Sequence, residues 1–243
     1  MMCEGKVAIV TGAAGKGMGR SIALTLGREG ASVVVNYRTS ADSAEAVANH
    51  IADRGGKALA FQADITRQDQ CKGLVDAAVE AFGKVDICII GPGAGWHPEP
   101  IERLDADGAL DDAQRELAPI YHLMPLVLPG MYERHWGRLI AIALTPPYKS
   151  PAYAYNVAKA ARTEALLIAC EAAWPHGVTV NTIGPGPVAE IESLERAIEF
   201  CAHGAAWQDR HTASPQDIAE GVALLCSPSG DFISGAVLPY MYR

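Results

Sequence analysis

Hydrophobic and polar positions divide this chain into two alternating kinds of segment. Short apolar runs bounded by turn residues indicate buried parallel strands, and they lie at residues 6–10, 31–37, 57–62, 85–90, 138–143, 178–183 and 236–238. Longer stretches with helical periodicity separate them, at 20–29, 41–54, 68–82, 105–134, about 155–174 and 189–204, with one more after Ser214. Strands and helices that alternate through short connections predict an α/β fold. We expect a single Rossmann-type domain over residues 1–243, a doubly wound parallel sheet with helices on both faces.

Composition narrows the class of protein further. Hydrophobic residues make up 49% of the 243 residues, enough for a full core, and the formal net charge of -8 disfavours nucleic acid as a partner. The six cysteines form no CxxC pair, so buried free thiols are expected and no metal site. Neither a secretory signal nor an apolar run of membrane-spanning length is present, so we expect a cytoplasmic protein without a membrane partner.

A glycine-rich turn follows the first predicted strand. Thr11–Gly19 reads TGAAGKGMG and leads directly into a helical pattern. A strand, a glycine-rich turn and a helix place a pyrophosphate on free backbone N–H groups at the helix N-terminus, where a Cβ would hold the phosphate away. A plain turn that happens to be rich in glycine and alanine is the alternative. The flanking strand and helix favour the nucleotide site.

The end of the second predicted strand indicates which nicotinamide cofactor is used. An acidic residue there would bind a ribose 2′-hydroxyl and repel a 2′-phosphate, but this chain has Asn36, with Arg38 two residues later. Lys16 in the glycine turn adds a second cation. A guanidinium suits a phosphate, so NADP(H) is favoured over NAD(H). Simple solvation of each cation at the surface is the alternative.

Tyr155 and Lys159 are the first candidates for catalysis. Residues four apart share one face of a helix, so the phenol and the ammonium can point into the same space. A nearby ammonium favours the phenolate, and we expect it to lower the pKa of Tyr155 from its ordinary value of about 10. That would give a usable acid or base near neutral pH. Such a pair is also common on exposed helix faces, where its role is structural.

The ordered set of these motifs resembles the short-chain dehydrogenase/reductase family over essentially the whole chain, nearest the branch with β-ketoacyl carrier-protein reductases and glucose dehydrogenases. The matching segments are Thr11–Gly19, Asp64, the Tyr155/Lys159 pair, Asn181–Gly186 and Ser214–Ala219. The resemblance implies a nicotinamide cofactor, Tyr155 as proton donor and Lys159 on the ribose. It also implies Asp64 near the adenine and a homotetramer or homodimer. The residues expected to hold the cofactor are Gly12, Gly15, Lys16, Gly17, Met18, Gly19, Asn36, Arg38, Asp64, Ile65, Gly91, Gly93, Lys159, Pro185, Gly186 and Val188.

The chain departs from the family pattern at four places. Its glycine turn has one extra residue, either Gly15 or Lys16, and Ile90–Gly93 reads IGPG where the family has NNAG. Glu116 stands where the family has a catalytic Asn, and Ala143 and Leu144 stand where its catalytic Ser should follow the fifth strand. The candidate catalytic residues are therefore Tyr155, Lys159, Glu116 and Thr145.

Two of these departures leave alternatives open. Thr145 replaces the serine if the loop shifts by one residue, Tyr155 works alone as in enoyl-reductase relatives, or Tyr148 or His97 supplies the donor. Losing such a donor typically costs about a hundred- to a thousandfold in rate. Glu116 either holds water beside Lys159, acts directly through its carboxylate, or turns outward into solvent.

These observations favour an NADPH-dependent reductase that transfers hydride to a carbonyl, or to a related C=N or C=C bond, of a small or medium apolar substrate. The alternative is a non-redox enzyme on the same scaffold, performing elimination, cyclisation or isomerisation with NADP as a structural group. A binding module that senses NADPH is the third possibility, because fold alone does not fix function. The substrate is not identified, since the expected lid at about 187–212 is the least constrained segment. Trp96, His97, Tyr153 and Trp207 either line the substrate space or pack as aromatics.

Overall fold

The computed structural model describes residues 1–145, 151–206 and 210–240. Tyr148 and Trp207, two of the aromatic candidates, lie outside the described residues. Seven parallel strands form one sheet in the order β3-β2-β1-β4-β5-β6-β7. They are β1 (Val7–Val10), β2 (Ser32–Tyr37), β3 (Lys57–Gln62), β4 (Ile87–Ile90), β5 (Gly137–Ile142), β6 (Val178–Pro185) and β7 (Val237–Tyr240). The predicted doubly wound α/β fold is confirmed.

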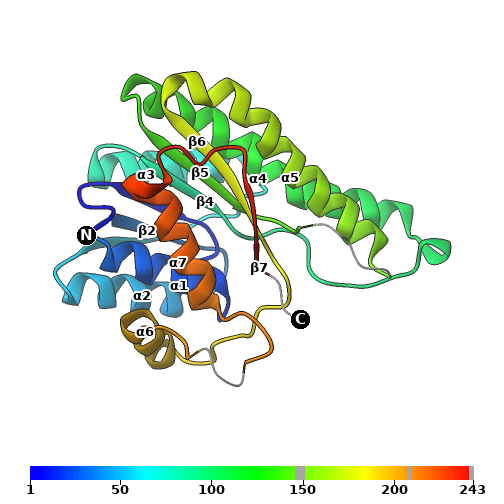
Figure 1. Cartoon of the computed structure of the whole chain (residues 1–243), viewed down its shortest axis with the longest axis horizontal. Coiled ribbons are helices and arrows are strands. Elements are labelled where there is room, and N and C mark those ends of the chain that lie inside the picture. Colours follow the sequence, from blue (N-terminus) through cyan, green and yellow to red (C-terminus); the bar gives the residue numbers. More distant parts are fainter. Residues whose placement is uncertain (146–150, 207–209, 241–243) are drawn as a thin grey trace.

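The described part of the chain contains seven α-helices, of which six lie against the sheet and α6 packs against α1 and α7 (Figure 1). They are α1 (Met18–Arg28), α2 (Ala41–Asp53), α3 (Gln68–Phe82), α4 (Ala106–Glu133), α5 (Tyr153–Ala173), α6 (Leu194–His203) and α7 (Pro215–Cys226). Three short 3₁₀ turns join them, at Ile101–Arg103, Trp174–His176 and Pro228–Gly230. Among the described residues, no helix is long and apolar enough to cross a membrane.

Alternate residues of each strand feed two separate cores. Val33 and Val35 of β2 belong to the cluster that packs with α1, α2 and α7, whereas Val34 belongs to the cluster with α3, α4 and α5. This is the alternation that successive Cβ atoms impose on a strand covered on both faces. The short apolar runs of the sequence are therefore strands buried on both sides.

The strand order reverses at β1, which has β2 on one side and β4 on the other. Connections on the two sides of such a point run to opposite faces of the sheet, so a crevice opens beyond the carboxyl ends of the strands. The glycine turn after β1 and the loop after β4 both leave the sheet there. The fold thus brings the predicted nucleotide turn and the predicted catalytic half to one edge.

Helix α4 differs from its expected form. The sequence predicts interruptions at Pro119, Pro125 and Pro129, but one helix of 28 residues continues through all three. Buried contacts of Ile120 and Leu123 with the second core hold the helix across the first of these positions. Tertiary packing outweighs the local cost of proline here. Helix α7 follows Ser214, as predicted, and the structure adds a reciprocal capping box between Ser214 and Asp217.

Candidate active site

The glycine turn is shaped for close backbone approach. Gly12 has a φ of +64°, and a Cβ at Gly19 would lie 2.4 Å from the carbonyl oxygen of Gly12. Helix α1 begins next to this turn with Gly17 as its N-cap, and no side chain caps it with a hydrogen bond. Its first N–H groups are therefore available to an anion, as a pyrophosphate site requires.

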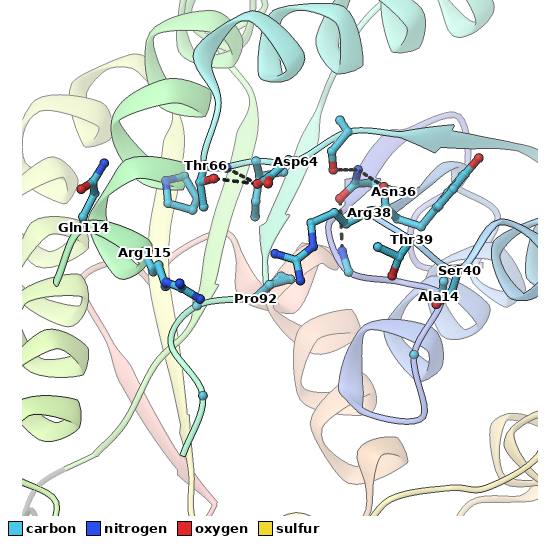
Figure 2. A pocket seen from close by; sticks show the side chains of 18 of the residues that line it. Ala14, Asn36, Arg38, Thr39, Ser40, Asp64, Thr66, Pro92, Gln114 and Arg115 are labelled. Atoms are coloured by element: carbon cyan, nitrogen blue, oxygen red, sulfur yellow. Dashed lines mark hydrogen bonds between the residues drawn. The ribbon is translucent and has the colours of Figure 1, made fainter. Parts of the chain in front are cut away.

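A pocket of about 650 Å³ opens beside this turn. It is lined by Gly12, Ala14, Gly15, Asn36, Tyr37, Arg38, Thr39, Ser40, Ala63, Asp64, Ile65, Thr66, Pro92, Gly93, Gly95, Asp111, Gln114, Arg115 and Pro119. Figure 2 shows the Arg38 and Arg115 side chains entering it from opposite sides, one from the end of β2 and one from α4. Arg115 also pairs through Nε with Asp111 at 2.6 Å. The pocket thus holds two cations that polar anionic ligands can reach.

Asn36 has a different task from the one its position suggested. Its Oδ1 accepts a hydrogen bond from the Gly12 N–H at 3.2 Å, and its Nδ2 donates to the Ala63 carbonyl at 3.0 Å. Although Asn36 lines the pocket, its amide ties the glycine turn to the end of β3. We conclude that it braces the walls of the pocket.

Asp64 also has local partners. Its Oδ1 accepts from the backbone N–H of Thr66 at 3.0 Å and from the Thr66 hydroxyl at 2.7 Å. Burial raises the pKa of Asp64, but these hydrogen bonds and the charge of Arg38 outweigh it and hold the pKa below its ordinary value. A stable carboxylate therefore stands at the rim of the pocket.

Lys16 is paired with a residue outside the pocket lining. Its ammonium forms an ion pair with Glu192, and its carbonyl accepts a hydrogen bond from the Ile191 N–H at 3.0 Å. The glycine turn is thereby attached to the segment before α6, within the expected lid. Lys16 is not among the residues that line the pocket, so its expected contact with a 2′-phosphate has no support from this structure.

The expected cofactor residues fall into two groups. Seven of them line the pocket: Gly12, Gly15, Asn36, Arg38, Asp64, Ile65 and Gly93. The other nine do not line it: Lys16, Gly17, Met18, Gly19, Gly91, Lys159, Pro185, Gly186 and Val188. Of these, Gly186 donates its N–H to the Tyr240 carbonyl at 2.7 Å, and Val188 forms a bridge with Ala213. Those two contacts order the start of the segment that follows β6.

Glu116 is fully buried at the centre of a charged cluster. Its Oε1 lies 2.9 Å from Lys159 Nζ and accepts the Ala94 N–H at 2.7 Å, while its Oε2 lies 2.9 Å from Arg162 Nη1. The side chains of Glu116 and Arg162 have no exposed surface, and that of Lys159 is 8% exposed. The alternative in which Glu116 turns outward into solvent is therefore wrong. An ionised carboxylate in such a place needs cations around it.

Tyr155 stands one turn before Lys159 on α5. Trp96, from the loop after β4, packs edge-on against its ring with centroids 5.0 Å apart, and Lys159 Nζ lies 5.6 Å from the ring centroid. Burial raises the pKa of Tyr155, and Glu116 raises it further against an opposing effect of Arg162. The expectation that Lys159 lowers this pKa is therefore wrong for this structure, because the lysine charge is paired with Glu116. The phenol is held as a neutral acid.

Lys159 is itself perturbed. Burial lowers its pKa and Arg162 lowers it further, while Glu116 opposes both. An ammonium carries three N–H donors, and the ion pair with Glu116 occupies one direction. Within the described residues, Glu116 is the only ion-pair partner of this ammonium, so two donors can serve other groups at the site. The expectation that Lys159 binds a ribose stays a prediction.

Thr145 is placed close to the site, but its hydroxyl is engaged. Oγ1 donates to the Gly184 carbonyl on β6 at 2.8 Å. Ala143 is likewise held to β6, through its N–H and the Ile183 carbonyl at 2.7 Å, and Leu144 follows with an apolar side chain. In the described residues of this turn, no hydroxyl proton is free for a substrate oxygen.

Three aromatic candidates lie at the surface of this region. The side chain of His97 is 58% exposed, and its Nε2 lies 2.8 Å from the buried Asp112 Oδ2. Trp96 is 61% exposed despite its contact with Tyr155, and Tyr153 is 46% exposed. Trp96 therefore presents an apolar surface next to the Tyr155 phenol, whereas the His97 ring is paired with the Asp112 carboxylate.

Arg162 is the member of this charged cluster that the motifs did not indicate. The signal was present in the spacing, because residues 155, 159 and 162 recur on one face of a helix. Arg162 is a second cation on the face of Lys159, and Glu116 lies on the preceding helix. Together they suggest a buried ion pair between Arg162 and Glu116. Neither residue alone predicts it.

Comparisons with known proteins identify relatives among reductases and dehydrogenases. A family model described as enoyl-(acyl carrier protein) reductase matches residues 12–240. The 7alpha-hydroxysteroid dehydrogenase of Escherichia coli is 33% identical over 97% of this chain and 92% of its own length. The 3-oxoacyl-[acyl-carrier-protein] reductase of Staphylococcus epidermidis is 29% identical over 96% of both chains.

Two solved structures are similar along nearly their whole length. A 7alpha-hydroxysteroid dehydrogenase complexed with NADH and 7-oxo glycochenodeoxycholic acid has a TM-score of 0.84 and 31% identity, over 98% of this chain and 93% of that chain. A short-chain dehydrogenase of Burkholderia cenocepacia in complex with NADP has a TM-score of 0.81 and 26% identity, over 99% and 98%. On these grounds, and on its ordered motifs, the chain belongs to the short-chain dehydrogenase/reductase family of oxidoreductases.

Proposed function

We propose that the protein is an NADPH-dependent reductase that transfers hydride to a carbonyl, or to a related C=N or C=C bond, of a small or medium apolar substrate. The observation that carries this proposal is the state of Tyr155. Burial and Glu116 raise the pKa of its phenol, and its ring packs against Trp96 of the loop that leaves the sheet after β4. A neutral acid at this place suits the delivery of a proton in a reduction.

The residues around the pocket fit a nicotinamide dinucleotide phosphate. The uncapped start of α1 would hold the pyrophosphate, and Asp64 and Ile65 would border the adenine. Arg38, with Thr39 and Ser40 beside it, would face the 2′-phosphate, with Arg115 across the pocket as a second cation. When bound, the nicotinamide supplies the hydride. Solved relatives hold NADH in one case and NADP in another, so the preference for NADPH rests on these cations.

The side chains at the reaction centre have separate roles. Tyr155 would hold and release the proton, and Lys159 would bind the ribose with the donors that Glu116 leaves unused. Glu116 would orient the Lys159 ammonium. Thr145 would contribute only to the fold of the turn, because its hydroxyl proton is engaged by Gly184.

The proposed substrate is apolar because Trp96 offers a large exposed ring beside Tyr155. A steroid ketone and a 3-oxoacyl thioester are the substrate types that the names of the relatives suggest. The segment 187–212 would close over the substrate as a lid. Its attachment to the glycine turn through Lys16, and to α1 through Arg20, supports a link between this lid and the cofactor site.

One observation favours a second candidate function. Ordinary carbonyl reduction in this family would use a hydroxyl donor where this chain has Leu144, and the neighbouring Thr145 hydroxyl is engaged. A non-redox reaction such as elimination or isomerisation needs an acid/base group and no such donor. Tyr155 and the Glu116–Lys159 pair would serve it, with NADP as a structural group.

We also propose that the protein is cytoplasmic and works as a homotetramer or homodimer. Leu110 and Tyr121 on α4 and Ile168 on α5 are 69%, 58% and 65% exposed, and a second copy of the chain would cover such apolar side chains. Light scattering coupled to gel filtration would measure the mass of the assembly. A monomer at micromolar concentration would contradict this part of the proposal.

The test of function is NADPH oxidation, followed by absorbance, with a panel that contains a 7-oxo steroid, a 3-oxoacyl thioester, simple ketones, cyclic imines and enones. We expect turnover with at least one member, absent in Tyr155→Phe. Loss of substrate without any NADPH oxidation, detected by mass spectrometry, would instead establish the non-redox alternative. NADPH binding by calorimetry with neither outcome would contradict both.

A further inference from the structure

The side chain of Arg162 is fully buried, so this cation does not serve as a solvated surface charge. Its Nη1 donates to the carbonyls of Gly91 and Ile142, at 3.2 and 3.1 Å, and its Nη2 donates to the carbonyl of Pro92 at 2.7 Å. One guanidinium therefore joins the exit of β4 to the end of β5. The first of these segments leaves the sheet at the crevice, and the second leads into the turn that Thr145 fastens to β6.

The same guanidinium is one of two cations on a single carboxylate. Glu116 lies 2.9 Å from Lys159 on one side and 2.9 Å from Arg162 on the other. Each of the three side chains is at most 8% exposed, so solvent screens their charges poorly. With both cations protonated, the cluster carries one net positive charge. That charge lies next to the Tyr155 phenol, which must become a phenolate when it gives up its proton.

We propose that Arg162 is a positioning residue for the reaction: it compensates the buried Glu116 carboxylate, sets the charge felt by Lys159 and Tyr155, and holds the β4 exit loop under them. This inference rests on the proposed function only in taking Tyr155 and Lys159 as the reacting pair. Without Arg162, Glu116 and Lys159 would form a neutral pair, and the excess positive charge beside Tyr155 would disappear.

The groups around Lys159 define what a titration would measure. Glu116 faces it from α4, and Arg162 lies one turn later on its own helix. Tyr155 lies one turn earlier, and His97 of the β4 exit loop is paired with Asp112 of α4. Glu116 raises the pKa of Lys159 and Arg162 lowers it. Removing Glu116 should therefore lower the pKa of Lys159, and removing Arg162 should raise it.

The experiment is an NMR titration of lysine labelled at Cε, with the Lys159 signal assigned from Lys159→Met. In Glu116→Gln the pKa of Lys159 is expected to fall by about one unit or more, and in Arg162→Met to rise by about one unit or more. The double variant Glu116→Gln/Arg162→Met removes both charges. Its Lys159 should titrate at higher pH than in Glu116→Gln alone, and this comparison decides the matter if Arg162→Met does not fold.

Arg138→Met is the matched control. Arg138 is also buried and also bonds to backbone carbonyls, those of Leu225 and Gly137, but it pairs with Asp231 away from the site. Its loss should lower stability without moving the Lys159 titration. An unmoved Lys159 pKa in the Arg162 variants, or a shift equal to that in Arg138→Met, would overturn the inference.

Turnover separates this inference from the proposed function. With an active substrate, Arg162→Met is expected to lower kcat about tenfold or more and to change the NADPH dissociation constant about threefold or less. If the titrations follow the expected order but no substrate is reduced, the proposed function fails and the charge assignment to Arg162 stands. If wild type reduces a substrate but the Lys159 pKa does not change in the Arg162 variants, the proposed function stands and the charge assignment to Arg162 fails.

Discussion

The hydroxyl of Thr145 donates its hydrogen bond to the backbone carbonyl of Gly184, 2.8 Å away on β6. A hydroxyl has one proton, so this bond leaves none for a substrate oxygen. The contact is tight, because a Cβ at Gly184 would lie 1.9 Å from Thr145 Oγ1. Thr145 therefore fastens the turn after β5 to the neighbouring strand.

We predict that Thr145→Ala leaves kcat/KM within about threefold of wild type, whereas loss of an oxyanion donor would cost about a hundredfold. Thermal unfolding should show that the free energy of unfolding falls by about 1 kcal/mol, because one intramolecular hydrogen bond disappears. Steady-state kinetics with the substrate found in the panel measures the first effect. A hundredfold loss with NADPH affinity intact would show that Thr145 turns toward the substrate during the reaction.

Leu144→Ser is the reciprocal change. It places a hydroxyl one residue before Thr145, where the family pattern expects its serine, and Leu144 is only partly buried. If the protein is a carbonyl reductase that lacks this donor, reduction of simple ketones should rise. No rise, together with retained NADPH binding, would favour the view that the pocket serves another chemistry.

Tyr155→Phe should remove most turnover, about a hundredfold or more, because the phenolic proton is lost while the ring keeps its packing against Trp96. NADPH affinity should be nearly unchanged.

Lys159→Ala should impair both turnover and NADPH affinity, since the ammonium would touch the ribose and its removal leaves Glu116 with Arg162 alone. Fluorescence titration with NADPH and single-turnover kinetics separate the two effects. Full activity in Tyr155→Phe would move the search for the proton donor to Glu116.

The direction of the Tyr155 pKa predicts how rate depends on pH. Because this pKa is raised, the phenol keeps its proton through neutral and mildly alkaline pH, and reduction should stay constant from roughly pH 6 to 9. Oxidation of the product alcohol needs the deprotonated phenol, so its rate should rise with pH over the same range. Profiles of kcat/KM in both directions test this. A reduction rate that falls between pH 6 and 7 would show that Tyr155 ionises far below its ordinary value.

The strands and the reactive helix were predictable because their signals are local. Apolar runs such as that of β2 have to be buried on both faces, and the spacing of Tyr155 and Lys159 fixes their common side. The burial of Glu116 was not predictable from its own helix, since it depends on a compensating cation, Arg162, on another helix. The pairing of Lys16 with Glu192, 176 residues away, depends equally on how distant segments meet.

The preference for NADPH over NADH should depend on Arg38 far more than on Lys16. Arg38 lines the pocket and Lys16 does not, so Arg38→Ala should weaken NADPH binding about tenfold or more and leave NADH binding nearly unchanged. Lys16→Ala should change the preference much less, because its charge is paired with Glu192. Calorimetric titration of both cofactors into both variants gives the four constants. Equal affinities for the two cofactors in wild type would refute the assignment.

Gly93 and Gly95 offer a matched pair for testing whether Glu116 must keep its place. A Cβ at Gly93 would lie 2.2 Å from Glu116 Oε1, whereas a Cβ at Gly95 would meet nothing within 4 Å. Gly93→Ala must therefore displace the carboxylate from Lys159 and Arg162, and we expect a stability loss of about 1–3 kcal/mol together with a lowered kcat. Gly95→Ala adds the same methyl group two residues along the same loop and should change neither quantity. Chemical denaturation and kinetics of the two variants measure both effects. If Gly93→Ala unfolds like wild type and keeps its kcat, the precise position of Glu116 is not required, and its role as the group that orients Lys159 is wrong.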